Sequence, residues 1–409
     1  MPVRWVDGNK ARVVVDRLAS VLGLNENGEV TLPIGPDFEA GSGVLANLFP
    51  FEATILEKRR LALTERAVLD CVKSSGLTVD ALLHELAKSQ TTYLRKPLNQ
   101  FILLSSVSVN LSPRLVARRM SGCHISFRRF RPRGFTNPDT LRDGGGHFGE
   151  APTDYTVVKV AVEAREPEDA VTYALDAVDL LRALWNFALG YGKWRVSMGG
   201  PGSPPVNIVL LGPIHTLHHR SGKPAYTGHW WDPTYVRAIT PTSLSPSSFT
   251  FEHRARRRLS RSPLGTELSA LFLEYVRALD DRLLNAAFVK LWGVLELITA
   301  SSGMSHEVTV RRGSFLFTER DFFRLCLGHL KDWRNKIAHR GVEADDAEHM
   351  LYQLKSFVDP LIRFLLDHHL AFKSLEEFGQ FLDLPTDSAI LRKRLADLQL
   401  ASRLHSHRD

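Results

Sequence analysis

The feature that most constrains the fold is a change of sequence pattern across residues 240–250, which read TPTSLSPSSFT. Nearly all of these residues are Ser, Thr or Pro, a composition typical of linkers. After the linker, apolar residues recur at helical spacing through most of the chain, in segments at 264–300, 318–340, 346–370, 374–383 and 387–403. Little strand pattern separates these segments. We therefore predict that residues 251–409 form an all-α helical bundle.

The sequence before the linker mixes helix and strand patterns. Residues 63–89 read as two helices. The segment YTVVKVAVEA at 155–164 alternates in the manner of a β-strand and leads into a long helical pattern. Shorter strand patterns occur at 101–111, 123–130 and 206–211. The chain is therefore predicted to be a multidomain α+β protein, with a mixed α/β domain over residues 1–250 and the helical bundle after it.

Composition and cysteine usage indicate a globular protein in a reducing compartment. Hydrophobic residues make up 44% and charged residues 24% of the 409 positions, which fits neither a disordered nor a membrane-spanning chain. The longest apolar runs are too short to cross a bilayer, and the N-terminus carries no signal-peptide pattern. Three widely spaced cysteines argue against a disulfide framework or a zinc cluster. We expect a cytoplasmic protein with no membrane partner.

The basic residues are unevenly distributed along a chain whose formal net charge is +7. Arginines concentrate in SFRRFRPRGF at 126–135 and in EHRARRRLSRS at 252–262. Such clusters suit phosphate contacts and equally suit a solvated surface. Three phenylalanines interleave with the first cluster, where they would stack on unpaired bases or lie in a half-buried strand. From this cluster we predict four RNA contacts, at Arg128, Arg129, Arg131 and Arg133.

Three other motifs contain residues that can bind a phosphate or a metal ion. The glycine-rich RDGGGHFGE at 142–150 and the GKP at 222–224 match neither a phosphate loop nor a dinucleotide fingerprint, and both read as surface loops. The histidines of HTLHH at 215–219 have no acidic or cysteine partner at a metal-binding spacing, so this segment also reads as a polar loop. We therefore predict no metal site and no cofactor.

The segment FTERDFFRLCLGHLKDWRNKIAHRG at 317–341 carries the strongest signal. Thr318 and Asp321 fit a capping box at the start of a helix, and Gly341 fits its end. The apolar residues between them fall on one stripe, and Arg334 lies in the middle of it. A guanidinium directed at a core needs a carboxylate partner or a cleft. The candidate partner is Glu296, one of few charges in the apolar segment 283–300.

The polar residues near the end of this helix do not share one face. His339 follows Arg334 by five residues, or about 140° around an ideal helix. Asn335 and His339, four residues apart, do lie on one face. For Arg334 and His339 to act on one phosphate, the helix must distort near its end or a second copy of the chain must contribute. The geometry favours a site assembled at a dimer interface.

The residues from Arg334 to Gly341, RNKIAHRG, resemble the R-x4–6-H signature of HEPN domains. The flanking sequence over residues 262–370, including LLNAAFVKLWGVLELI, resembles the Apea-like branch of that superfamily. The resemblance implies a helical bundle that dimerises as a metal-independent endoribonuclease, with Arg334 and His339 as the catalytic pair and Asn335 as the polar residue that follows the arginine. It also implies a toxin-like effector in phage defence or abortive infection. We add Lys336 and Arg340 as RNA contacts.

Histidine suits proton transfer at a ribose 2′-OH, and arginine suits charge that builds on phosphoryl oxygens. Cleavage is then expected to give a 2′,3′-cyclic phosphate and a 5′-OH. Two alternatives stay open: a non-catalytic HEPN module that binds RNA, a nucleotide or a protein, and a structural bundle in which Arg334 is a buried tie. The expected partners are RNA, with tRNA among the candidates, a second copy of the chain, and an unknown trigger for residues 1–250.

Overall fold

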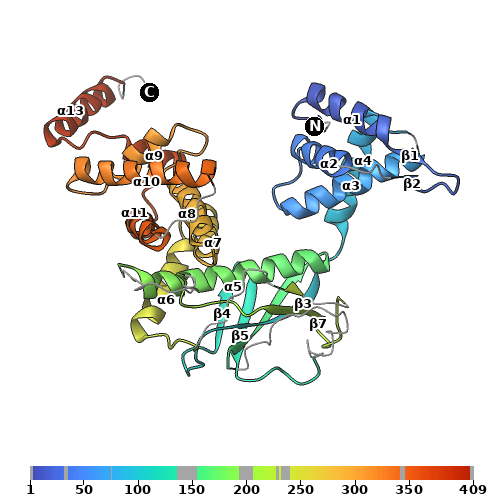
Figure 1. The fold of residues 1–409 in the computed structure, drawn as a ribbon, viewed down its shortest axis with the longest axis horizontal. Coiled ribbons are helices and arrows are strands. Elements are labelled where there is room, and N and C mark those ends of the chain that lie inside the picture. The colour runs from blue at the N-terminus through green and yellow to red at the C-terminus, as the bar shows by residue number, and fades with distance from the viewer. Residues whose placement is uncertain are drawn as a thin grey trace. The chain divides into compact units, whose positions relative to one another are not determined.

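The computed structural model describes residues 3–31, 36–74, 76–135, 154–192, 206–226, 230–231, 240–340 and 346–405, except for the side chains of Trp231, His339 and Arg340. The chain divides into two compact units. Unit 1 comprises Met1–Gln100 and Glu163–Ala170, and unit 2 comprises Phe101–Val162 and Val171–Asp409. Within the described ranges the fold is a mixture of helices and one main sheet, which confirms the α+β class (Figure 1).

Unit 1 is built mainly from four helices. They are α1 (Gly8–Val21), α2 (Asp37–Leu48), α3 (Glu57–Ser74) and α4 (Val79–Arg95), and a short hairpin of β1 (Gly23–Leu24) and β2 (Val30–Thr31) joins the first two. The two helices predicted within 63–89 are α3 and α4. Asp7 begins α1 by accepting backbone N–H groups, and Thr78 does the same for α4. Side chains from all four helices share one apolar core.

The main sheet has six strands in the order β4-β5-β6-β3-β7-β8. These strands are β3 (Asn99–Val107), β4 (Ala117–Met120), β5 (Cys123–Arg128), β6 (Thr156–Ala164), β7 (Ile214–His219) and β8 (Trp230–Trp231). Alternate residues of β6 are buried, as its sequence predicted. Helix α5 (Pro167–Gly190) follows β6, and its Trp185 ring lies 5.8 Å from the Phe127 ring of β5. The strand patterns at 101–111, 123–130 and 155–164 are therefore confirmed in their main parts.

Two predictions about strands are wrong. Residues 206–211 form no strand, and Leu211 alone makes an isolated bridge, with Val107. The side-chain oxygen of Asn186 accepts the backbone N–H groups of Ile208 and Val209 at 2.8 Å each, so these groups are not available to a neighbouring strand. Conversely, the HTLHH segment is not a polar loop, because it forms most of the largely buried strand β7.

The chain after residue 245 is helical, as predicted, within the described residues. The helices are α6 (Pro246–Leu259), α7 (Gly265–Leu279), α8 (Leu284–Ile298), α9 (His306–Gly313), α10 (Arg320–Arg340), α11 (Ala347–Asp367), α12 (Leu375–Leu382) and α13 (Ser388–His405). The apolar helix α8 is central, since it packs against α7, α10 and α11. Its residues Phe288, Leu291 and Leu295 are fully buried. This packing matches the expectation that a helix apolar nearly all round is buried.

The Ser/Thr/Pro segment at 240–250 is partly ordered by its own side chains and by the sheet. Ser245 begins α6 by accepting the backbone N–H of Ser248 at 3.1 Å. Thr242 bridges to Val109 beside the end of β3. The boundary predicted at residue 250 therefore falls inside α6 and inside unit 2. The division into an N-terminal domain and a bundle at that position stays a prediction.

A buried ion network joins α5 to α7 within unit 2. Arg182 of α5 donates to Asp280 at 2.7 Å, to Asp179 at 2.8 Å and to the carbonyl of Val209 at 3.0 Å. Its side chain is almost entirely buried. Burial by itself lowers the pKa of Arg182, but Asp280 and Asp179 together outweigh it and raise that pKa. Asn207 adds a hydrogen bond of 2.8 Å to Asp280. This network fixes the end of α7 against α5. Among the described helices, none is both long and apolar enough to cross a membrane.

Candidate functional site

Helix α10 carries the residues predicted to be catalytic. It begins at Arg320, whereas a cap at Thr318 predicted a start at residue 319, so the predicted start differs from the observed one by a single residue. It ends at Arg340, as expected, while Gly341 lies outside the described residues. Leu327 and Leu330 of the predicted stripe are fully buried, and Phe323, Cys326 and Ile337 are half-buried. The inward face of α10 is therefore the one that its sequence predicted, and it packs against α8 and α9.

Arg334 lies on this inward face and is half-buried. Its Nη1 donates to Oδ1 of Asn335 at 3.4 Å, a long hydrogen bond. Its Nε is buried and has no hydrogen-bond partner among the described residues. No carboxylate in the described part of the chain forms an ion pair with this guanidinium. The side chain is thus a cation held near a packed surface without an anionic partner, the condition under which a bound phosphate would be stabilising.

Glu296 does not play the role of ion-pair partner that the sequence suggested. Its carboxylate accepts a hydrogen bond of 2.9 Å from Nε1 of Trp292, one turn earlier in α8. It also lies 3.9 Å from Nδ1 of His306 at the start of α9. The His306 ring stacks on Trp292, with ring centroids 6.1 Å apart and an angle of 24° between the planes. Glu296 therefore belongs to a Trp292–Glu296–His306 cluster, and the proposed pairing with Arg334 is corrected.

His306 is a candidate functional residue that the sequence reasoning missed. It is a half-buried histidine beside a carboxylate, and its Nδ1 has no hydrogen-bond partner among the described residues. Its neighbour Glu307 forms an ion pair of 2.6 Å with Lys331 of α10, three residues before Arg334. The hydrogen bond from Lys331 lowers the pKa of Glu307, and the same bond raises the pKa of Lys331. The cluster is thus adjacent to the helix that carries the motif.

Asn335 and His339 complete the predicted motif. Asn335 is half-buried, and His339 occupies the last turn of α10, although its side chain lies outside the described residues. The assigned helix is continuous from Arg320 to Arg340. On such a helix the two positions differ by about 140° and by roughly 7.5 Å along the axis. The structure therefore brings Arg334 and Asn335 together and places residue 339 at a different position around the same helix.

The predicted RNA contacts occupy several environments. Arg128, Arg129 and Arg133 are exposed at the end of β5 and in the segment after it. Arg131 instead turns toward the sheet, where it donates to the Thr216 hydroxyl at 2.8 Å. On α10, Lys336 is exposed, and the side chain of Arg340 is outside the described part. RNA binding by these residues stays a prediction.

The phenylalanines of the first arginine cluster also differ from one another. Phe127 is 7% exposed and packs on Trp185, which places it in the core rather than on a base-stacking surface. Phe130 is 73% exposed, and the guanidinium of Arg129 lies 5.4 Å from its ring centre. Phe130 is therefore the one member of this set that is both aromatic and accessible beside exposed arginines, within the described residues.

The remaining motifs have structural explanations where they are described. His218 is fully buried, and its ring nitrogens contact the Gly222 carbonyl at 3.2 Å and the Thr216 hydroxyl at 3.0 Å. Gly222 has φ +89°, and a Cβ there would lie 2.3 Å from the Gly134 carbonyl, so the glycine of the GKP segment permits a close backbone approach. The glycine-rich segment 142–150 lies outside the described residues. In the described ranges, no three His, Cys, Asp or Glu side chains are grouped so as to hold a metal ion.

Comparisons of the chain with models of protein families, with curated proteins and with solved structures return no match. Any functional conclusion therefore rests on the residues of the chain and their arrangement.

Proposed function

We propose that this chain is a metal-independent endoribonuclease of the HEPN type, in which Arg334, Asn335 and His339 of α10 act on a phosphodiester of RNA. The observation that carries the proposal is the environment of Arg334. Its guanidinium is half-buried, its Nε lacks a partner among the described residues, and its only described hydrogen bond is the long one to Asn335. A cation in this position is stabilised when an anion such as a phosphate binds beside it.

In the proposed reaction, His339 accepts the proton of a ribose 2′-OH as the 2′-oxygen attacks the adjacent phosphorus. The bond from the 2′-oxygen to phosphorus forms, the bond from phosphorus to the 5′-oxygen breaks, and the leaving 5′-oxygen takes a proton from water, which His339 then restores. Arg334 stabilises the negative charge that builds on the phosphoryl oxygens, and Asn335 positions the phosphate. The products are a 2′,3′-cyclic phosphate and a 5′-OH. Because the 2′-OH is the nucleophile, DNA is not a substrate.

The proposed active form is a homodimer. On the continuous helix α10, Arg334 and His339 diverge by about 140°, so one undistorted helix does not direct both side chains at one phosphate. Two copies of α10 meeting near their C-terminal ends would supply Arg334 from one copy and His339 from the other.

The wider setting is proposed from the resemblance of residues 262–370 to Apea-like HEPN domains. In this proposal the protein is a toxin-like effector in phage defence. It acts on RNA in the cytoplasm, and residues 1–250 sense a trigger. The exposed Arg128, Arg129, Arg133 and Phe130 support contact with a single strand of RNA, because they combine phosphate-binding and base-stacking side chains.

The test compares purified Arg334→Ala and His339→Ala proteins with Arg324→Ala and His329→Ala, which remove exposed residues of the same types from the same helix. The first pair is expected to lose RNA cleavage by about a hundredfold or more, and the control pair to keep it. Product ends are identified by mass spectrometry, and cleavage is repeated with chelator and with 2′-deoxy substrate. Undiminished cleavage by the His339→Ala protein would contradict the proposal. RNA binding without cleavage by the unmodified protein would instead indicate a non-catalytic module.

A further inference from the structure

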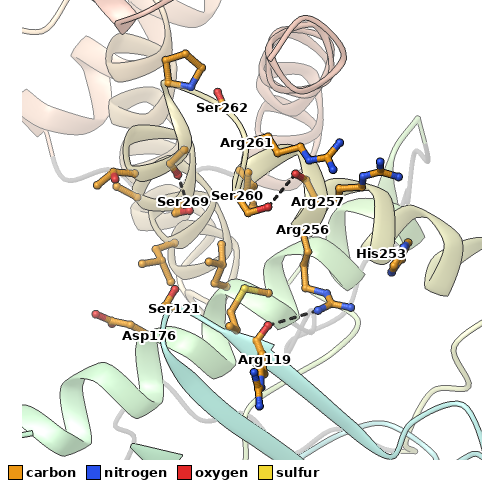
Figure 2. Close-up of a pocket in the computed structure, with 18 of the residues that line it drawn as sticks. Arg119, Ser121, Asp176, His253, Arg256, Arg257, Ser260, Arg261, Ser262 and Ser269 are labelled. Atoms are coloured by element: carbon orange, nitrogen blue, oxygen red, sulfur yellow. Dashed lines mark hydrogen bonds between the residues drawn. The ribbon is translucent and has the colours of Figure 1, made fainter. Parts of the chain in front are cut away.

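A cavity of about 980 Å³ lies in unit 2 where α5, α6, α7 and the end of β4 meet. None of the residues of the proposed ribonuclease motif lines it. It instead contains most of the second arginine cluster of the sequence, at 252–262, for which the sequence alone left a choice between phosphate contacts and solvated surface. Figure 2 shows the side chains that border it.

The cavity is lined by an excess of basic side chains. His253, Arg257 and Arg261 follow one another at intervals of four residues, so they extend from one side of α6 and the turn after it (Figure 2). All three are exposed, and neither arginine has an ion-pair partner among the described residues. Arg119 of β4 and Arg256 of α6 also line the cavity. Several guanidinium groups are therefore accessible to a ligand.

The nearby carboxylates do not cancel this charge. Asp176 is the one acidic residue of the described lining, and it already pairs with Arg277. Glu252, which pairs with Arg256 at 2.9 Å, is 1% exposed and also accepts from Arg118 at 2.7 Å and from Trp185 at 3.1 Å. Both carboxylates are thus occupied by cations of their own. The field that an entering ligand meets is positive.

The start of α7 adds uncommitted donors to the same cavity. Gly265, Thr266 and Ser269 of its first turns are in the lining. The residue that begins the helix, Leu264, has no side-chain cap, and the backbone N–H groups of Thr266 and Glu267 have no acceptor in the described part of the chain. At the end of α6, the carbonyls of Arg256, Arg257 and Arg258 accept from the N–H groups of residues 260–262 and from the Ser260 hydroxyl, and the Leu259 carbonyl has no donor among the described residues. At the cavity, unpaired backbone N–H groups therefore outnumber unpaired carbonyls, which favours an anionic ligand.

The floor of the cavity is apolar. Tyr173 and Leu273 line it and are half-buried, so a ligand can reach them, whereas Met120, Leu180 and Leu259 also line it but are almost fully buried. A cationic rim over an apolar floor matches a ligand with a phosphoryl group at one end and a ring or apolar group at the other. The volume is near the upper end of the range of about 300–1,000 Å³ found for small-molecule sites.

We propose that this cavity binds a small organic phosphate of the nucleoside-phosphate class. The phosphoryl oxygens contact Arg257, Arg261 and the free donors at the start of α7, and the base or other apolar part lies on Tyr173 and Leu273. The site goes beyond the proposed ribonuclease function and does not depend on it, because no residue of the motif on α10 takes part. It would give unit 2 a ligand that is distinct from its RNA substrate.

The test measures binding of two probes, ATP and inorganic pyrophosphate, to the full-length protein by isothermal titration calorimetry. The Arg257→Gln/Arg261→Gln double variant removes two exposed charges, so its fold is expected to be intact. Its affinity for both probes is expected to fall at least about tenfold. The control is Arg254→Gln, an exposed arginine of α6 that does not line the cavity, and its affinity should stay within about twofold.

Two outcomes would overturn the inference. The first is a failure of the unmodified protein to bind either probe at millimolar concentration, or an equal affinity of the double variant for the probes. The second is displacement of ATP by a short single-stranded RNA, together with loss of RNA binding in the double variant. That result would show that the cavity binds part of an RNA strand. RNA cleavage by the double variant is measured in parallel. Retained cleavage with lost ATP binding separates this site from the motif on α10.

Discussion

In α10, Nη1 of Arg334 donates a hydrogen bond of 3.4 Å to Oδ1 of the adjacent Asn335, and the Nε of the same guanidinium has no partner in the described residues. The two residues lie on the helix that packs against α8 and α9, next to the Trp292–Glu296–His306 cluster. An amide is a neutral partner, so the charge of Arg334 remains available to an anion. This relationship is what distinguishes the proposed site from a structural ion pair.

Mixing two inactive variants would reveal whether the site is shared between copies. An Arg334→Ala copy retains His339, and a His339→Ala copy retains Arg334. If each site takes its arginine from one copy and its histidine from the other, their heterodimer contains one intact site, and cleavage returns to about half of the normal level per heterodimer. The activity is measured after co-expression with two different affinity tags and tandem purification. No recovery in a verified heterodimer would place both residues of each site in one copy.

Removing Arg182 is expected to destabilise unit 2 strongly. The Arg182→Ala variant leaves Asp179 and Asp280 buried without their shared cation, and breaking such a pair from one side costs about 3–5 kcal/mol. The free energy of unfolding is measured by urea denaturation followed by circular dichroism. Arg66→Ala is the control, since Arg66 is exposed and pairs with Asp70 at 3.7 Å on the surface of α3. A loss as small as that of the control would contradict the network described here.

Stability should fall as pH drops below the ordinary pKa of histidine because of His218. Burial lowers the pKa of His218, and the charge of Arg131 lowers it further. Between its lowered pKa in the folded protein and a value of about 6.5 in the unfolded chain, the unfolded state binds more protons, so acidification favours unfolding. A His218→Gln variant is expected to flatten this part of the curve. The check is the unfolding midpoint of both proteins in urea over a series of pH values, and parallel curves would contradict it.

Two of the three cysteines are expected to be inert in the folded protein. Burial raises the pKa of Cys71 and of Cys123 to about 11, so little thiolate is present near neutral pH. Cys326 on α10 is half-buried and is expected to be alkylated first. Iodoacetamide labelling, digestion and mass spectrometry of native and urea-unfolded protein would measure this order. Labelling of Cys71 or Cys123 at the same native rate as Cys326 would contradict it.

Local sequence pattern predicted much of the fold because helix and strand faces are set by residues near one another in the chain. The stripe on α10, the alternation in β6 and the apolar helix α8 are of this kind. The strand predicted at 206–211 is absent, because a contact from outside the segment decides its structure. Its β-branched residues favour a strand, but the Asn186 side chain, some twenty residues earlier, takes two of its N–H groups. No pattern within the segment records that contact.

In the candidate site, too, the features set by local sequence were predicted, and those set by contacts between distant residues were not. The inward position of Arg334 follows from helical spacing alone, and the structure places it on the buried side of α10. The partner of Glu296 could not be predicted, because His306 reaches it only through the packing of α9 beside α8. The Ser/Thr/Pro segment has the composition of a linker, but side-chain capping by Ser245 and the bridge from Thr242 to Val109 order its backbone.

Because Arg182 of α5 binds Asp280 at the end of α7, the helices after residue 250 are not expected to fold independently of α5. A fragment that begins at residue 251 would keep Asp280 and lose both Arg182 and the hydrogen bond from Asn207. A fragment transferred to another protein would therefore have to include α5 and the segment containing Asn207 as well as these helices. In recombination, natural or engineered, a viable crossover should fall near the start of β3, where unit 2 begins, rather than at the Ser/Thr/Pro segment.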